Sequence, residues 1–319
     1  MQRFTGREYL LIDIANAFGL DKCTWIVRLA WAYLQVQHFE DLVEEADDKY
    51  LYAKAVNAWR QVEAGNPTGH IMFLDSTASG LQLMAVLSGC LATAKATNLI
   101  NTGMREDVYM AIAEGMEMTR NEIKKPLMTT FYNKQSVDGF NESQQEHFDI
   151  LCSEAFPGPV SVLGLVNDAW DNTALYHQWT LPDGHIAHKK VVETVMTSVE
   201  VDELEHTSVT VAWAANQAKD WYGSLAPDVV HSVDAYVARE MVRRATAQEF
   251  QLVTIHDAFG ACPNHMNKVR QNYIDILVEI AESNLLQDIL SEITGESVQL
   301  TKDSYDLPKY IKESEYALS

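Results

Sequence analysis

Two aspartates, each placed directly after a short apolar run, constrain the fold of this chain more than any other feature. Asp75 follows the run Ile71 to Leu74, and Asp257 follows the run Leu252 to Ile255 and His256. Runs of this length and composition are typical of short buried strands. The two aspartates are 182 residues apart in a chain of 319 residues. A fold that uses both must therefore bring distant strands into one sheet.

Two carboxylates at the end of a buried sheet are costly unless a cation neutralises them. Their oxygen ligands favour Mg²⁺, which keeps several waters and also takes phosphate oxygens of a substrate. Two such ions could clamp the attacking and leaving oxygens of an in-line phosphoryl transfer. A single His-Asp dipeptide is expected by chance in a chain with ten histidines, so this interpretation needs support from other segments.

A second segment, RNEIKKPLMTTFYN at 120–133, carries polar and aromatic residues four apart: Arg120, Lys124, Met128 and Tyr132. On a helix these side chains share one face. The two cations suit a triphosphate, and Met128 and Tyr132 suit a sugar and base. Because proline is tolerated in a first turn, Pro126 predicts that the regular helix begins near Lys124. The alternative is a solvated basic face backed by a core aromatic.

The segment DSTASGLQ at 75–82 places small residues between Asp75 and a predicted helix. Small side chains leave room for a ligand against the backbone. The alternative is an ordinary strand-to-helix turn in which Gly80 serves helix packing.

The remaining chain is predicted to be largely helical, with one β-hairpin at 189–213. Valines and threonines alternate in that hairpin, and Asp202 to Glu205 gives it an acidic tip. A break is expected at 157–159, and an irregular tail at the end. Further helices are predicted at 7–64, 81–94, 104–119, 142–152, 212–223, 231–249 and 264–291.

The net charge of −21 opposes nucleic-acid binding, because affinity for DNA comes largely from Lys and Arg. On charge alone, an acidic enzyme that binds no nucleic acid is the simpler interpretation. The sequence has no long uncharged apolar stretch, so no membrane span is predicted. Its four cysteines form no Cys-x-x-Cys pair, which argues against a zinc ribbon and a disulfide framework.

Taken together and in order, these segments resemble the single-subunit phage and mitochondrial RNA polymerases. DSTASGLQ is similar to motif A of that family, 120–133 to motif B, and IHDAFG at 255–260 to motif C. WTLPDG at 179–184 and APDVVHSVDA at 226–235 match as well. The resemblance covers nearly the whole chain.

The resemblance implies a role for each matching residue. Asp75 and Asp257 would bind two Mg²⁺ ions, with the carbonyl of Ser76 as an extra ligand. Contacts to the incoming nucleotide would come from motif B: Arg120, Lys124, Met128 and Tyr132.

The resemblance also implies how ribose is selected. Related DNA polymerases carry a glutamate at the position of Gly80, which blocks a 2′-hydroxyl, whereas glycine leaves that space open. Tyr132 and His231 would sense the sugar or the nascent pair, and Gln82 and His256 would support the site.

Two departures from the family pattern affect expectations. The Tyr-Gly pair that ends motif B is Tyr132-Asn133 here, although Asn also tolerates a left-handed backbone. The hairpin at 189–213 falls where the family carries its promoter-reading loop. It is short and acidic, so it is not expected to read duplex DNA.

Motif A begins at residue 75, whereas family members have hundreds of residues before it. Because the chain starts with Met1 and ends with EYALS, similar to the family terminus, it is expected to be complete. A second chain would then supply the N-terminal domain and thumb, as in two-chain podovirus enzymes that transcribe middle genes. A basic partner would offset the −21 charge. A single-stranded-DNA-binding protein is expected to recruit the enzyme. The expected location is the cytoplasm of an infected bacterial host.

The predicted fold is therefore an α+β right hand, with palm at 1–100 and 231–319 and fingers at 101–230. The expected function is that of a DNA-directed RNA polymerase catalytic subunit, which adds ribonucleoside triphosphates to nascent RNA on a DNA template. The alternatives are a related DNA polymerase or primase-like enzyme, and a non-catalytic scaffold chain.

Overall fold

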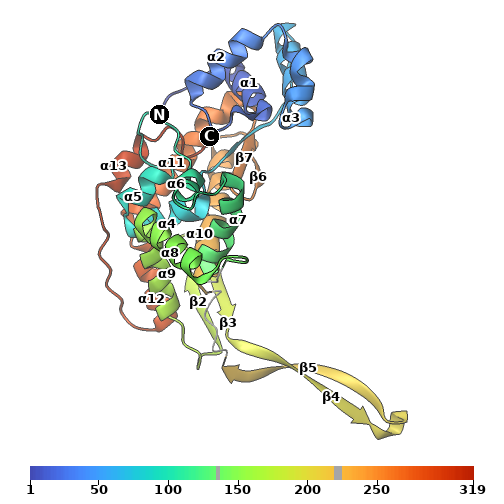
Figure 1. Cartoon of the computed structure of the whole chain (residues 1–319), viewed down its shortest axis with the longest axis vertical. Helices are drawn as coiled ribbons and strands as arrows, with labels where there is room; N and C mark the ends of the chain where they lie inside the picture. Colours follow the sequence, from blue (N-terminus) through green and yellow to red (C-terminus); the bar gives the residue numbers. More distant parts are fainter. Residues whose placement is uncertain (134–136, 219–224) are drawn as a thin grey trace.

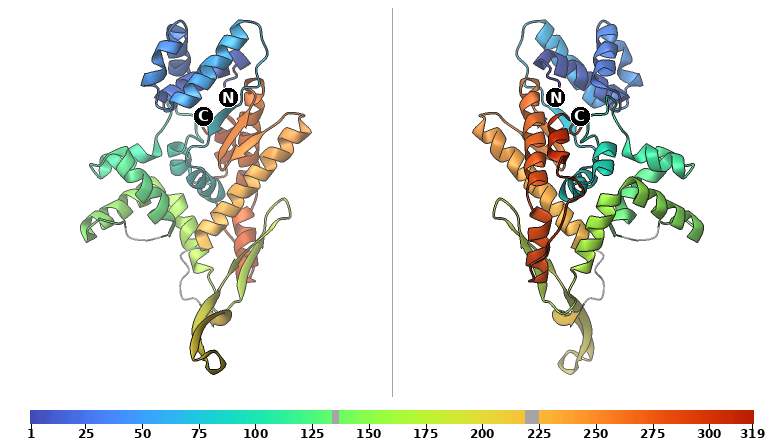
Figure 2. Two further views of the ribbon diagram at one scale, coloured as in Figure 1. Left: turned by 90° about the vertical axis from the view of Figure 1, so that its right-hand side faces the viewer. Right: turned by 90° about the vertical axis from the view of Figure 1, so that its left-hand side faces the viewer.

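The chain folds into a mostly helical body with small antiparallel sheets, and a two-stranded ribbon projects from it (Figure 1). This computed structural model describes residues 1–133, 137–218 and 225–319, and leaves aside the side chains of 129–133, 192–193 and 214–218. The predicted α+β class agrees with this arrangement. Helices α6–α9 lie on one side of the body, and α10 and α11 lie on the other (Figure 2).

The N-terminal helices form a group with its own core, as the prediction of helix over 7–64 implies. They are α1 (Gly6–Ala15), α2 (Trp25–Gln35) and α3 (Lys49–Glu63), joined by short turns of π- and 3₁₀-helix. Thr5 and Glu8 form a reciprocal cap that begins α1. The core of the group includes Leu10, Phe39 and Trp59.

The central sheet joins segments from opposite ends of the chain. It has the order β1 (Met72–Asp75), β7 (Ala258–Ala261), β6 (Val253–Ile255), and both pairings are antiparallel. Asp75 pairs with Ala258, and Ala258 also pairs with Ile255. His256 and Asp257 therefore form a two-residue hairpin turn, and His256 adopts the left-handed φ of 53° that such turns require.

A helical layer packs around this sheet and forms the main core. It comprises α4 (Ser79–Ser88), α5 (Leu91–Ala96), α10 (Leu225–Ala247), α11 (Met266–Glu282) and α12 (Leu285–Thr294). The helix α4 is buried on nearly every side, and it packs against α9, α10 and α11. A helix that is apolar all round belongs in the centre of a fold, so α4 fixes the position of the segment 75–78 that precedes it.

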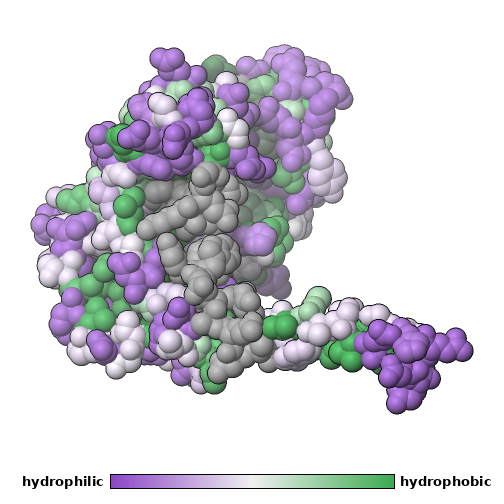
Figure 3. Space-filling model, turned by 60° about the horizontal axis from the view of Figure 1, so that its bottom comes forward, coloured by the Kyte–Doolittle hydropathy of each residue, from purple (hydrophilic) through white to green (hydrophobic). Residues whose placement is uncertain are grey.

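The middle of the chain contributes the remaining elements. Its helices are α6 (Val108–Gly115), α7 (Arg120–Asn133), α8 (Glu142–Ala155) and α9 (Pro157–Asp168). A first hairpin is formed by β2 (Tyr176–Thr180) and β3 (Ile186–Lys190), and the projecting ribbon by β4 (Val192–Val201) and β5 (Thr207–Ala218). The predicted hairpin is thus present, and it is longer than predicted (Figures 1 and 3).

The prediction that the helix of segment 120–133 begins near Lys124 is wrong, because α7 begins at Arg120. Thr119 and Glu122 form a reciprocal cap: the backbone N–H of Thr119 donates to the Glu122 carboxylate, and that of Glu122 donates to the Thr119 hydroxyl. This cap starts the helix one turn early and leaves Pro126 inside it.

Other predicted boundaries also differ from the structure. The helix predicted at 212–223 is wrong up to Ala218, where β5 continues its pairing with β4, and 219–224 lie outside the described residues. The break at 157–159 instead begins α9, with Pro157 in the first turn. The tail contains one short helix, α13 (Leu307–Lys312).

Among the described residues, no single helix is long and apolar enough to cross a membrane. The consecutive helices α8 and α9 reach that length and apolarity only as a pair bent by 105°.

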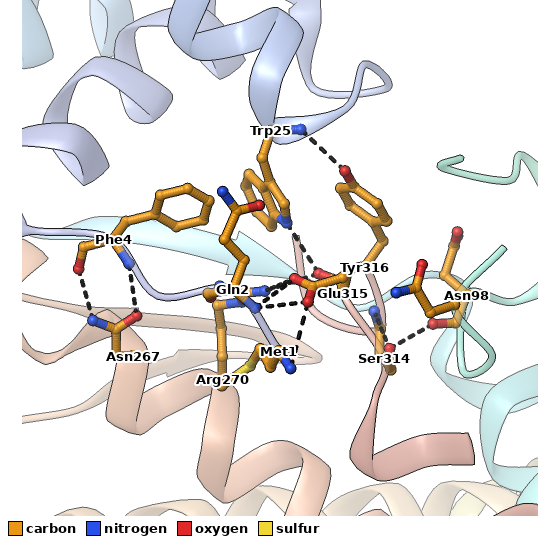
Figure 4. A network of polar contacts seen from close by, with 12 residues as sticks. Met1, Gln2, Phe4, Trp25, Asn98, Asn267, Arg270, Ser314, Glu315 and Tyr316 are labelled. Carbon is orange, nitrogen blue, oxygen red and sulfur yellow. Dashed lines mark hydrogen bonds and ion pairs between the residues drawn. The ribbon is translucent and has the colours of Figure 1, made fainter. Parts of the chain in front are cut away.

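Arg270, on α11, fastens both chain ends to the body (Figure 4). Its fully buried guanidinium donates to the carbonyl oxygen of Gln2 at 2.8 Å and to that of Glu315 at 2.9 Å. It also lies 3.3 Å from the Glu315 carboxylate, which in turn accepts from the N–H of Gln2. The side chain of Trp25 donates to the Glu315 carbonyl oxygen as well, so α2 joins the same network.

We expect Arg270→Ala to lower the free energy of unfolding by about 3–5 kcal/mol, because it leaves buried carbonyls and a half-buried carboxylate without their cation. Denaturant titration followed by circular dichroism measures this loss. The matched control is Lys312→Ala, which removes an exposed ion pair with Glu282 and should cost less than about 1 kcal/mol. Equal losses in the two variants would contradict the role given to Arg270.

Candidate active site

The structure brings Asp75 and Asp257 to the same end of the central sheet. Asp75 ends β1, and Asp257 lies in the turn between β6 and β7. Ser76 links them: its N–H donates to the Asp257 carbonyl oxygen at 3.3 Å, and its hydroxyl donates to the Asp257 carboxylate at 2.8 Å. Burial raises the pKa of Asp75, and the negative charge of Asp257 raises it further. The two carboxylates are therefore close enough to repel each other.

A third carboxylate, Asp234 on α10, belongs to the same group. Burial and the charge of Asp257 raise the pKa of Asp234 to about 6, although His231, His256 and a hydrogen bond with Ser79 act in the opposite direction. Asp234 is not among the residues predicted for the site. The available signal was its position three residues after His231, which places both side chains on one face of a helix.

Four cationic side chains line a cavity of about 110 Å³ together with four carboxylates, those of Asp21, Asp75, Glu106 and Asp107. The cations come from the α1–α2 connection, the segment before α6, and α7: Lys22, Arg105, Arg120 and Lys124. Lys22 and Lys124 both lower the pKa of Asp75, against the larger effect of its burial. Lys22 and Arg105 were not predicted, because neither lies in a segment with a recognisable pattern.

The predicted basic face of α7 lines this cavity with Arg120 and Lys124. Arg120 forms an ion pair with Asp107 at 2.6 Å, and its guanidinium lies 4.9 Å from the ring centroid of Tyr109. Met128 accepts a hydrogen bond from the Tyr109 hydroxyl at 3.3 Å. The Tyr132 side chain lies outside the described residues, as does that of Asn133.

The other predicted residues surround this centre. Gly80 is the second residue of α4, and His231 is exposed on α10. Gln82 is fully buried, and its amide donates to the Ala317 carbonyl oxygen at 3.0 Å and accepts from the Tyr273 hydroxyl at 2.7 Å. Gln82 therefore joins α4 to the C-terminal segment and to α11.

The C-terminal segment runs alongside the residues that follow β1. The N–H of Ser319 donates to the Asp75 carbonyl oxygen at 3.0 Å, and that of Thr77 donates to the Ala317 carbonyl oxygen at 3.3 Å. Ser319 also lines the cavity and accepts a hydrogen bond from Arg105 at 3.1 Å. The last residues of the chain thus form one wall of the site, a contribution that no local sequence pattern indicates.

Among the described residues, the group of three side chains whose possible metal-ligand atoms all lie within 4.8 Å of one another is Glu200, Asp202 and His206, exposed at the tip of the ribbon. It is separate from the carboxylates of the central sheet.

We expect Asp234→Asn to stabilise the protein at about pH 7 in EDTA, by at most about 3 kcal/mol. A raised pKa means that the stability linked to Asp234 is fully present below its ordinary pKa and is lost as the pH rises through about 6. Asparagine does not ionise, so the advantage of the variant should disappear near pH 4. Thermal melts across this pH range measure the effect.

Asp288→Asn, on the exposed face of α12, is the control and should show no comparable pH dependence. An Asp234→Asn advantage that stayed constant from about pH 4 to pH 7 would exclude this linkage.

Comparison with known proteins adds an independent line of support. A family model described as DNA-dependent RNA polymerase matches residues 4–201 and 185–316. The mitochondrial DNA-directed RNA polymerase of Neurospora crassa is 25% identical over 163 residues, which cover 40% of this chain and 12% of that protein. Its counterpart from Schizosaccharomyces pombe is 28% identical over 162 residues, covering 40% and 14%.

A probable DNA-directed RNA polymerase of Gelasinospora sp. is 21% identical over 355 aligned positions, covering 89% of this chain and 42% of that protein. The chain therefore spans less than half the length of each of these relatives. Since the family model matches nearly all of it, including both segments that supply the paired aspartates, the chain belongs to the DNA-dependent RNA polymerase family of the phage and mitochondrial type.

Proposed function

We propose that this chain forms the nucleotide-adding centre of a DNA-directed RNA polymerase. One observation carries the proposal: Asp75 and Asp257, distant in sequence, meet at one end of a sheet, and Asp75 lines a cavity that also contains four cationic side chains. The reaction is the attack of an RNA 3′-hydroxyl on the α-phosphorus of a nucleoside triphosphate, with pyrophosphate as the leaving group. Such a reaction needs positioning and charge neutralisation more than covalent chemistry.

The acidic residues fit Mg²⁺, because they offer hard oxygen ligands whose mutual repulsion a cation would relieve. Asp75 and Asp257 would hold two ions, with the Ser76 carbonyl as a further ligand. Bound Mg²⁺ supplies neutralisation of the charge on the attacking and leaving oxygens. The Ser76 hydroxyl fixes the orientation of the Asp257 carboxylate, and His256 gives the turn its left-handed backbone.

The cationic side of the cavity suits the triphosphate. Arg120 and Lys124 extend from α7 toward the space that Asp75 lines, and Lys22 and Arg105 add two charges from other segments. Arg120 is paired with Asp107, so a phosphate would share or replace that partner. Four cations beside an acidic centre would bind the phosphates and stabilise the departing pyrophosphate.

Ribose selection is proposed for Gly80, Tyr132 and His231. Gly80 has no side chain to exclude a 2′-hydroxyl, and His231 projects from the helix that also carries Asp234. Met128 would contact the nucleotide from the same helix as Tyr132.

The right-hand arrangement is also a proposal, with palm at 1–100 and 231–319 and fingers at 101–230. It is supported by the sheet and helices that join the two palm ranges, and by the grouping of α6, α7 and α8 on one side of the body (Figure 2). The thumb and the N-terminal domain have no proposed counterpart in these ranges.

The proposed partners are a DNA template, the nascent RNA, ribonucleoside triphosphates and a second polypeptide that supplies the thumb and N-terminal domain. The charge of −21 supports the second polypeptide, because a basic surface is needed to hold nucleic acid. We also propose that a single-stranded-DNA-binding protein recruits the enzyme, and that the enzyme acts in the cytoplasm of an infected bacterial host. Processive synthesis of long RNA by this chain alone would refute the need for a partner.

We expect Asp257→Asn to lower ribonucleotide addition to a primed template by about a thousandfold or more, because several kcal/mol of transition-state stabilisation depend on the metal ions. Radiolabelled primer extension with Mg²⁺, using the complex in which the chain is active, measures the rate. Asp288→Asn on α12 is the matched control and should keep the wild-type rate. Wild-type extension by Asp257→Asn would exclude this site as the catalytic centre and favour a scaffold role.

We expect Gly80→Glu to reduce the preference for ribonucleotides over deoxynucleotides by about 10-fold or more, because the new side chain would meet the 2′-hydroxyl. Competing incorporation of the two nucleotide classes measures the preference. Gly69→Glu is the control, since a Cβ at that position meets no atom within 4 Å. A wild-type enzyme that prefers deoxynucleotides would instead support the DNA-polymerase alternative.

A further inference from the structure

The ribbon formed by β4 and β5 has one face made almost entirely of apolar and β-branched side chains. In the antiparallel register, Val195 pairs with Trp213, Thr197 with Val211, and Val199 with Val209. Because side chains alternate across a strand, these pairs lie on one face. The intervening pairs form the opposite face, which is mixed: it carries Ser198 with Thr210 and Glu200 with Ser208, and also the apolar pair Met196 with Ala212.

No layer of the described structure covers this apolar face. Among the described residues, β4 and β5 pack extensively only against each other. The exposed fraction is between 41% and 47% for each of four residues on this face: Val199, Val209, Val211 and Trp213. The face is therefore open to solvent. An isolated two-stranded hairpin is marginally stable in water, and a counter-layer normally completes it.

The charge of the ribbon restricts what can cover it. Residues 192–218 contain no Lys or Arg and five acidic residues. Three of these, Asp202, Glu203 and Glu205, lie at the tip, where hydrophilic residues gather beyond the apolar stretch (Figure 3). Phosphates of DNA or RNA would be repelled at this acidic end of the ribbon, and the rest of the ribbon offers no Lys or Arg to bind them. A second copy of the chain would bring two acidic ribbons together, at a similar electrostatic cost.

We propose that the apolar face of the β4–β5 ribbon binds a protein partner whose apolar contact strip is bordered by Lys and Arg. The valines and Trp213 supply the apolar contact, and Trp213 is the kind of residue that dominates interface energies. The acidic tip pairs with the basic border and aligns the partner along the ribbon. This inference is independent of the catalytic proposal, because it rests on none of the residues around Asp75.

Site-specific photocrosslinking in the full chain, in the cells that naturally produce it, tests this proposal. Benzoylphenylalanine replaces Val211 on the apolar face or Thr210 on the opposite face, which is the matched control. We expect a protein adduct from position 211 and at least about tenfold less from position 210. Mass spectrometry should locate the attachment in an apolar segment that has Lys or Arg beside it.

The charge requirement is tested by adding Glu203→Lys and Glu205→Lys to the Val211 crosslinking variant. Two reversed charges should reduce the adduct by about tenfold. An adduct to nucleic acid, an adduct to a second copy, equal yields from both faces, or no adduct would each overturn the proposal, as would an adduct insensitive to the reversed charges.

A binding measurement with purified protein gives a separate check on the nucleic-acid alternative. In one variant, a short Gly-rich turn replaces residues 195–213, and its body should keep its fold because the ribbon packs extensively only on itself. Fluorescent single-stranded and duplex oligonucleotides should bind this variant as tightly as the wild type, or more tightly. Weaker binding by the shortened variant would show that the ribbon contacts nucleic acid and would overturn the proposal.

Discussion

The pairing of β7 with both β1 and β6 is the constraint on which the rest of the site depends, because it brings Asp75 and Asp257 to one end of the sheet. Burial and the charge of Asp257 raise the pKa values of Asp75 and Asp234. The fold therefore disfavours the ionised forms of these two carboxyl groups. The register of β1 with β7 sets where two of the carboxylates lie, and the Ser76 hydroxyl holds Asp257 in place. Lys22 and Lys124 offset part of the repulsion at Asp75. The arrangement is costly without a cation, which is why it is informative about chemistry.

The framework that holds this centre depends on buried polar contacts between segments far apart in the chain. The amide of Gln82 joins α4 to the C-terminal segment and to Tyr273 of α11. Arg270 of α11 then binds the carbonyl oxygens of Gln2 and Glu315. Gln82, Tyr273 and Arg270 are buried, so losing one of their partners would leave a polar group unsatisfied in a low-dielectric interior. The chain ends are therefore part of the support of the site.

How far the sequence could predict the site depends on whether each signal is local. The strand-aspartate segments and the alternation of the hairpin are local patterns, and both were read correctly. The start of α7 also has a local signal, since Thr119 and Glu122 have capping-box spacing, whereas Pro126 predicts a start one turn later. Lys22, Arg105 and the wall formed by Ser319 could not be predicted from local pattern, because tertiary packing alone brings them to the cavity.

The cavity beside Asp75 gathers four cationic side chains in a chain whose net charge is −21. Net charge acts over long distances and is screened within about 10 Å at ordinary salt, whereas a phosphate in the cavity would meet Lys22, Arg105, Arg120 and Lys124 directly and would compete with the carboxylates beside them. The ribbon carries a concentrated part of the acidic excess and extends away from the body (Figure 1). This distribution of charge permits local phosphate binding, while the negative net charge weakens non-specific attraction to nucleic acid. Cations gathered at one cavity are thus compatible with a strongly acidic chain.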